Sequence, residues 1–110
     1  MHFVRHPFFE RDLIGIVDHI VEVTDGDTAA ALRRLDEIDT LFEAIVENPT
    51  SGARLGGKLD GWLVRHGGVG HRLTIVFKPV IETATLYLAL VVFGGRDWMK
   101  LAAARQVFAG

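Results

Sequence analysis

Three arginines, Arg65, Arg72 and Arg96, are the residues of this sequence whose type and spacing could do chemistry. Arg65 and Arg72 flank a Gly-rich turn at residues 67–70, where glycine tolerates the positive φ angles that tight turns need. If this turn closes a simple hairpin, Arg65 lies directly opposite Arg72. Like charges in that position destabilise a pair of strands. We therefore expect the fold to use them as a surface that binds phosphates or carboxylates.

The same hairpin register sorts the neighbouring side chains onto two faces of the sheet. One face is apolar, because the register pairs Val64 with Leu73 and Trp62 with Ile75. The other face gathers four polar or basic side chains, namely Arg65, Arg72, Thr74 and Lys78. Two interpretations stay open for this face. Either it binds an anionic partner, or carboxylates of the chain itself neutralise it.

Cleavage of RNA is one reaction that a cluster of arginines can support. It requires an acid or base to activate the ribose 2′-hydroxyl, and cations to stabilise the developing charge on the phosphate. Arg65, Arg72 and Arg96 are the candidate catalytic cations, but no serine or threonine nearby has an evident base with an orienting partner. The sole tyrosine, Tyr87, falls in an apolar run and is expected to pack in the core.

Neither a metal site nor a cofactor is expected. His66 faces His71 in the predicted hairpin, but zinc takes three or four protein ligands and the chain has no cysteine. The glycines do not follow the spacing of phosphate-binding loops. His19 falls on the polar side of a predicted helix and is interpreted as a surface residue.

Two amphipathic helices precede these segments and form a predicted antiparallel hairpin. The first starts at Phe9, and the second ends at Asn48, because a residue before proline avoids the helical conformation. Asp12 and the other acidic residues of the first helix are expected to face water. The apolar stripes comprise Leu13, Ile16, Val17 and Ile20 in the first helix, and Ala31, Leu32, Leu35, Ile38, Leu41, Phe42, Ile45 and Val46 in the second.

The remaining segments predict strands and one last helix. The strands are expected at residues 3–5, 62–66, 71–78 and 85–93, and the helix from Trp98 to about Phe108, with Asp97 as its N-cap. The order is strand, helix, helix, three strands, helix. This order predicts a single α+β domain over residues 1–110, with a helical hairpin packed on a small antiparallel sheet.

Charge is divided unevenly along the chain. Residues 1–50 hold four basic and eleven acidic side chains, a balance of -7, whereas residues 51–110 hold eight basic and three acidic ones, a balance of +5. This division predicts a surface that meets an anionic partner. The sequence shows neither a signal peptide nor an apolar run long enough for a membrane-spanning helix, so no membrane partner and a cytoplasmic location are expected.

Several motifs together resemble the RelE/ParE toxin superfamily. Residues 11–20 (RDLIGIVDHI) resemble its first-helix signature "DL..I..yI", and Ala31, Leu35 and Phe42 match its second helix. Residues 71–77 (HRLTIVF) resemble the strand "yRi.Y.v", and residues 86–97 resemble the closing pattern "v..v.HgaRd". The resemblance covers roughly residues 9–101 in the order of the superfamily.

The resemblance implies the toxin of a bacterial type II toxin–antitoxin system. It implies a cognate antitoxin that wraps an acidic segment around the toxin, with a possible higher-order complex. RelE-like members cut messenger RNA on the ribosome and ParE-like members inhibit DNA gyrase. Arg65, Arg72 and Arg96 fall where RelE-like enzymes place their cations. The residues expected to bind a partner are Arg65, Arg72, Lys78, Arg96, Trp98 and Leu101.

Departures from the pattern favour the ParE-like branch, which is not an enzyme. Gly94 stands where the pattern often has histidine, Phe77 replaces an aromatic hydroxyl, and the last helix has no tyrosine. Two alternatives stay open: a RelE-like ribosome-dependent endoribonuclease, and a protein-interaction module without toxicity.

Overall fold

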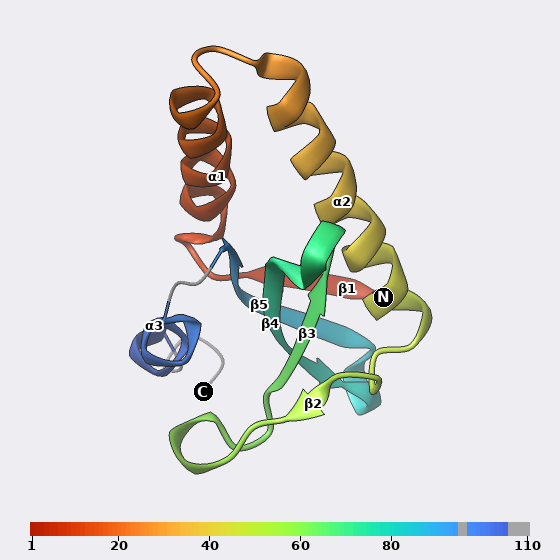
Figure 1. Ribbon diagram of the computed structural model, residues 1–110. Helices are drawn as coiled ribbons and strands as arrows, with labels where there is room; N and C mark the ends of the chain where they lie inside the picture. Colours follow the sequence, from red (N-terminus) through yellow and green to blue (C-terminus); the bar gives the residue numbers. More distant parts are fainter. Residues whose placement is uncertain (95–96, 106–110) are drawn as a thin grey trace.

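A five-stranded mixed sheet separates a long helical hairpin from a short C-terminal helix (Figure 1). The computed structural model describes residues 1–94 and 97–105. The strands are β1 (His2–Arg5), β2 (Ala53–Arg54), β3 (Leu63–Gly67), β4 (Leu73–Val80) and β5 (Thr85–Phe93). The helices are α1 (Phe9–Val23), α2 (Thr28–Glu47) and α3 (Trp98–Arg105). Three short 3₁₀ turns lie at Gly57–Leu59, Val69–His71 and Ile81–Thr83.

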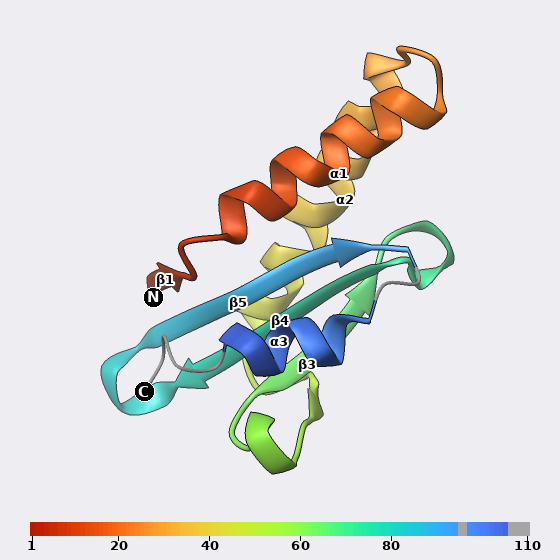
Figure 2. The same ribbon diagram turned by 90° about the vertical axis from the view of Figure 1, so that its left-hand side faces the viewer.

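The predicted start of α1 at Phe9 and the predicted end of α2 before Pro49 are confirmed. Asp27 caps α2, because its carboxylate accepts a hydrogen bond of 3.0 Å from the backbone N–H of Ala30. The helix ends at Glu47, before Asn48-Pro49. The hairpin extends well beyond the sheet (Figure 2). One residue of the predicted stripe, Leu32, is wrongly placed there, since it is 61% exposed.

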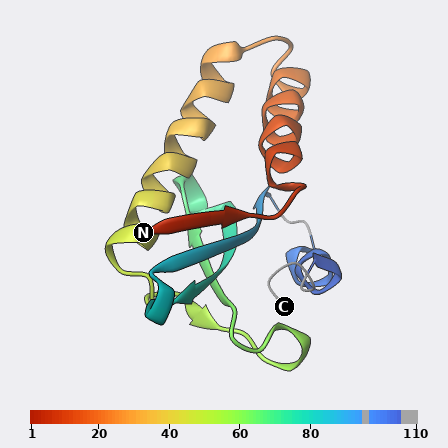
Figure 3. The same cartoon turned by 180° about the vertical axis from the view of Figure 1, so that it is seen from behind.

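The sheet is mixed, whereas the sequence predicts an antiparallel one. Its strand order is β1-β5-β4-β3-β2, and β1 runs parallel to β5 at the edge (Figure 3). A parallel pair needs a long connection, and here the whole hairpin and three further strands lie between the two partners. The other pairs are antiparallel. The α+β class and the predicted order of the long elements are confirmed, and the two-residue strand β2 is additional.

The register of β3 against β4 differs from the predicted one. Arg65 pairs with Ile75, three residues beyond Arg72, and His66 pairs with Thr74 rather than His71. The loop causes the shift. It runs on through a 3₁₀ turn with positive φ at Gly68, Gly70 and also His71, so it does not close a simple hairpin. An odd shift turns every side chain of one strand to the opposite face.

Side chains of the sheet alternate between two apolar cores. Leu73, Ile75 and Phe77 of β4 face the hairpin, and each is completely buried there. Val76 of β4 and Leu90 of β5 face α3. The predicted interior position of β5 is confirmed, because it is covered on both faces.

A bulge interrupts the ladder between β4 and β5. Val76 pairs with Leu90 and Phe77 with Leu88, so Ala89 has no partner on β4. Its carbonyl accepts a hydrogen bond of 2.9 Å from Arg105 Nη1 on α3. The bulge therefore gives α3 a backbone acceptor on the sheet.

Among the described residues, none of the helices combines the length and the apolar character that crossing a bilayer would require.

Candidate functional site

The side chain of Arg65 lies on the hairpin side of the sheet and contacts the C-terminal end of α2. Its Nη1 donates hydrogen bonds to the carbonyl of Ala44 (3.3 Å) and to the hydroxyl of Ser51 (2.5 Å). The carbonyl of Ala44 also accepts a hydrogen bond of 3.2 Å from the backbone N–H of Asn48, so the guanidinium is its second donor and meets the negative end of the helix dipole. The described contacts of Arg65 are therefore those of a structural residue.

Arg72 lies just before β4, at the other end of β3. Its guanidinium stacks on the ring of Phe93, with 5.1 Å from Cζ to the ring centroid, and its carbonyl accepts a hydrogen bond of 2.8 Å from Gly94 N–H. The side chain is exposed, and within residues 1–94 and 97–105 no carboxylate lies within salt-bridge distance of it. Arg72 thus keeps an uncompensated charge in the part of the chain that the structure describes.

The predicted basic face does not form. Lys78 lies on the α3 side of the sheet, where its Nζ is 6.0 Å from the centroid of the Trp62 ring. Thr74 also faces α3, and its hydroxyl lies 2.8 Å from Nδ1 of His66. Arg65 faces the hairpin instead. The prediction that these residues share a face with Arg72 is wrong, because it rested on the hairpin register.

The C-terminal helix packs on the sheet of its own chain. Trp98 and Leu101 are half-buried against the α3-side core, and Trp98 meets His66 edge-on, with ring centroids 6.0 Å apart. Asp97 caps the helix as predicted, since its Oδ1 accepts a hydrogen bond of 3.2 Å from Lys100 N–H. Arg96 and Phe108 lie outside the described residues.

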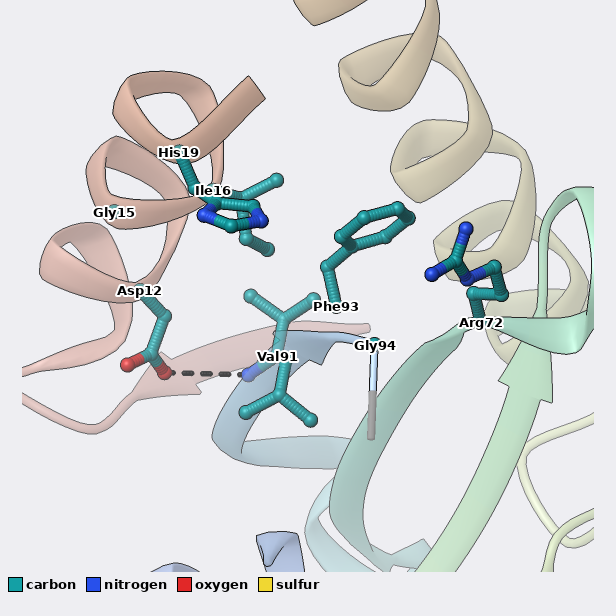
Figure 4. A pocket seen from close by; sticks show the side chains of 9 residues that line it. Asp12, Gly15, Ile16, His19, Arg72, Val91, Phe93 and Gly94 are labelled. Carbon is teal, nitrogen blue, oxygen red and sulfur yellow. Dashed lines mark hydrogen bonds between the residues drawn. The ribbon is translucent and has the colours of Figure 1, made fainter. Parts of the chain in front are cut away.

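A cleft lies between α1 and the adjoining ends of β4 and β5, and we call it the α1 cleft (Figure 4). It encloses about 550 Å³. The described residues that line it are Asp12, Gly15, Ile16, His19, Arg72, Val91, Val92, Phe93 and Gly94.

Four of these residues come from a single face of α1. Asp12, Gly15, Ile16 and His19 follow the spacing i, i+3, i+4, i+7, which places them in one stripe along the helix. The sequence predicts that Asp12 and His19 both face the solvent, because they lie off the apolar stripe of the helix. His19 is exposed as predicted, whereas Asp12 is nearly buried. The spacing was the signal that could have grouped them, since Ile16 in the same stripe is buried.

Asp12 lines the α1 cleft, and the prediction that it faces water is wrong, because its side chain is nearly buried. It receives hydrogen bonds from Arg105 Nη1 (2.6 Å) and Nη2 (2.8 Å), and from the backbone N–H of Val91 (3.2 Å). The side chains of Arg105 and Asp12 are 8% and 10% exposed. The pair is electrically neutral and joins α1, β5 and α3.

His6 lies close to this ion pair and has an altered acidity. Burial, and after it the positive charge of Arg105, lower the pKa of His6, and the nearby Asp12 opposes them in part. Its Nδ1 accepts a hydrogen bond of 3.0 Å from Phe8 N–H, a bond that the neutral ring alone can make. The neutral form of His6 is therefore part of the start of α1.

The α1 cleft provides a cation, an imidazole and an apolar wall, which can hold an anionic group next to an apolar one. Among the described residues there is no group of three or more histidine, aspartate or glutamate side chains that could hold a metal ion. Neither the protein-family models nor the curated proteins include a match to this chain.

Proposed function

We propose that this protein is the toxin of a type II toxin–antitoxin pair of the ParE-like kind. It acts by binding DNA gyrase, and a cognate antitoxin neutralises it through an acidic segment. The superfamily motifs at residues 11–20, 71–77 and 86–97 support this proposal. So does the observation that carries it most directly: a helical hairpin lies over a sheet whose last strand leads to a further helix, in the order that the resemblance implies.

The positions of the arginines favour a binding protein over a nuclease. Catalysis of RNA cleavage needs donors within about 3 Å of the same developing charge. Arg65 instead caps α2, and Arg72 stacks on Phe93 beyond the other end of β3. A binding surface has no such requirement, because separate cations can each meet their own acidic partner.

A RelE-like ribonuclease is the second candidate, and one observation favours it. His19 and Arg72 line the same cleft, so an acid–base group and a cation share one site. In this reading His19 activates the 2′-hydroxyl and Arg72 stabilises the charge on the phosphate.

Induced expression in a bacterium, without any antitoxin, tests the proposal. We expect growth to stop. The purified protein should then inhibit supercoiling by gyrase and leave cleaved complexes. If gyrase is unaffected and primer extension instead finds cuts in translated messages, the ribonuclease is the better assignment. Undisturbed growth with the folded protein present would favour an interaction module without toxicity.

A further inference from the structure

We propose that the α1 cleft binds a carboxylate side chain of an extended acidic peptide, with the neighbouring apolar residue of that peptide packed on the cleft wall. Arg72 receives the carboxylate, and Ile16 with Phe93 receives the apolar group. The inference rests on the proposed function in one respect, because the antitoxin is then the protein that carries this peptide.

Arg72 carries a positive charge that no described carboxylate neutralises. Two arginines contact the ring of Phe93, with Arg34 Cζ 5.4 Å and Arg72 Cζ 5.1 Å from its centroid. Arg34 is already neutralised, because its Nη1 donates to both carboxylate oxygens of Glu37. Arg72 pairs with no described carboxylate, so it keeps its donors for an incoming one. The stack on Phe93 holds its guanidinium in place beforehand.

The face of α1 that lines the cleft includes a glycine. Gly15 leaves a gap in the helix surface, because a Cβ built there meets nothing within 4 Å. Gly15 lines the cleft together with the buried Ile16 and the exposed His19, whose imidazole points into the cleft (Figure 4). A side chain of a bound peptide can therefore approach the helix backbone there.

The carboxylate of Asp12 does not oppose an anion in this cleft. Arg105 and the N–H of Val91 occupy its oxygens, and the ion pair with Arg105 cancels its charge. With Asp12 neutralised, Arg72 is the remaining full charge among the described residues of the lining. The cleft is thus locally positive, although the first half of the sequence is acidic.

The surroundings favour an acidic peptide over a nucleic acid. The phosphate chain of RNA or DNA needs a row of cations to replace its counterions. The described lining of the cleft offers one full cation, Arg72, and the exposed residues Asp36, Asp39, Glu43 and Glu47 of α2 add only negative charge to the surface of the hairpin. A peptide that brings one carboxylate and one apolar side chain needs no more than this single cation and the apolar wall.

Titration with two capped tripeptides, followed by amide signals in NMR, tests the inference. The probes are acetyl-Leu-Glu-Leu-amide and its uncharged counterpart acetyl-Leu-Gln-Leu-amide. We expect the first to shift the amide signals of Gly15, Val92 and Gly94, and the second to bind about tenfold more weakly, because it loses the charged hydrogen bond. Equal affinity of both probes, or shifts confined to another surface, would overturn the proposal.

Two variants and a matched control sharpen the test. Arg72→Glu reverses the charge that binds the carboxylate. Gly15→Leu places a bulky side chain in the cleft. Because leucine favours the helix more than glycine does, the melting temperature of the Gly15→Leu variant should not fall. Both should lose the binding of the glutamate peptide. Arg33→Glu makes the same change in net charge on the exposed outer face of α2 and should bind normally. Retained binding in Gly15→Leu would show that the peptide sits elsewhere.

Titration with a short single-stranded oligoribonucleotide tests whether the cleft binds a nucleic acid instead. If it shifts the same amides more strongly than the glutamate peptide, the cleft is a nucleic-acid site and the inference fails. The outcome is separable from the proposed function. A chain that stops growth but does not bind the peptide overturns the cleft assignment alone, whereas peptide binding without any effect on growth overturns the toxin proposal alone.

Discussion

Asp12 on α1 and Arg105 on α3 form a two-point ion pair, with Nη1 to Oδ2 at 2.6 Å and Nη2 to Oδ1 at 2.8 Å. Both side chains are at most one-tenth exposed, so water gives them little stabilisation. The pair connects the two layers that cover opposite faces of the sheet. Its loss should therefore affect the whole domain.

Removing one partner of this pair should cost much more than removing both. Asp12→Ala leaves the Arg105 charge buried without a partner, and we expect the free energy of unfolding to fall by about 3–5 kcal/mol. The double variant Asp12→Leu with Arg105→Leu should recover most of this loss. Urea denaturation of the three proteins measures both effects. A double variant as unstable as Asp12→Ala would show that the bonds to the Ala89 and Val91 backbone dominate instead.

Stability should fall as pH falls, in part through His6. Its pKa is lowered in the folded protein, so the fold favours the neutral ring. The contribution is fully present above the ordinary histidine pKa of about 6.5 and is lost as pH falls below it, through the lowered folded-state pKa. Unfolding free energies measured between about pH 8 and pH 5 should show this decline. The decline should be smaller in His6→Asn, whose side chain can still accept the hydrogen bond from Phe8 N–H.

Gly52 should not tolerate even one methyl group. A Cβ there would lie 2.9 Å from Leu63 Cβ and from the Val64 carbonyl oxygen, and the backbone cannot yield as a flexible side chain can. Gly52→Ala should lose about 1–3 kcal/mol of unfolding free energy. Gly56→Ala is the matched control, since nothing lies within 4 Å of its Cβ position and its φ is -123°. If thermal unfolding finds both variants equally stable, the close packing at Gly52 is refuted.

Replacing Arg65 by alanine should mainly lower stability, whereas replacing Arg72 should mainly weaken binding at the α1 cleft. Arg65→Ala removes the bonds to Ala44 and Ser51, and should lower the free energy of unfolding by about 1 kcal/mol. Arg72→Ala removes only an exposed stack on Phe93 and should cost about 0.5 kcal/mol. Neutralisation by a co-expressed antitoxin should follow the opposite order, with Arg72→Ala the variant that the antitoxin neutralises less well. Neutralisation lost only in Arg65→Ala would contradict the role given to the α1 cleft.

Local patterns predicted the elements well, because each depends on neighbouring residues. The period of the apolar stripe located α1, and Asn48-Pro49 located the end of α2. The predicted range of β5, residues 85–93, matches the structure. These signals are properties of one segment, which a sequence displays directly.

The register and the site depended on information that no single segment holds. His71 adopts a φ of 55°, a conformation rare outside glycine, and the loop it belongs to shifts β4 by three residues. Asp12 was interpreted as a surface residue because its partner Arg105 lies 93 positions away. The parallel pairing of β1 with β5 is a contact of the same long range.

The separation between Asp12 and Arg105 also bears on how the chain is made. A ribosome completes α1 long before it reaches residue 105, so the nascent hairpin exposes a carboxylate that has no counter-charge during most of translation. The bulged strand that supplies the Ala89 carbonyl likewise emerges late. The two layers can therefore be joined only near the end of synthesis. A nascent chain stalled before α3 emerges would contain the helical hairpin without the ion pair between Asp12 and Arg105.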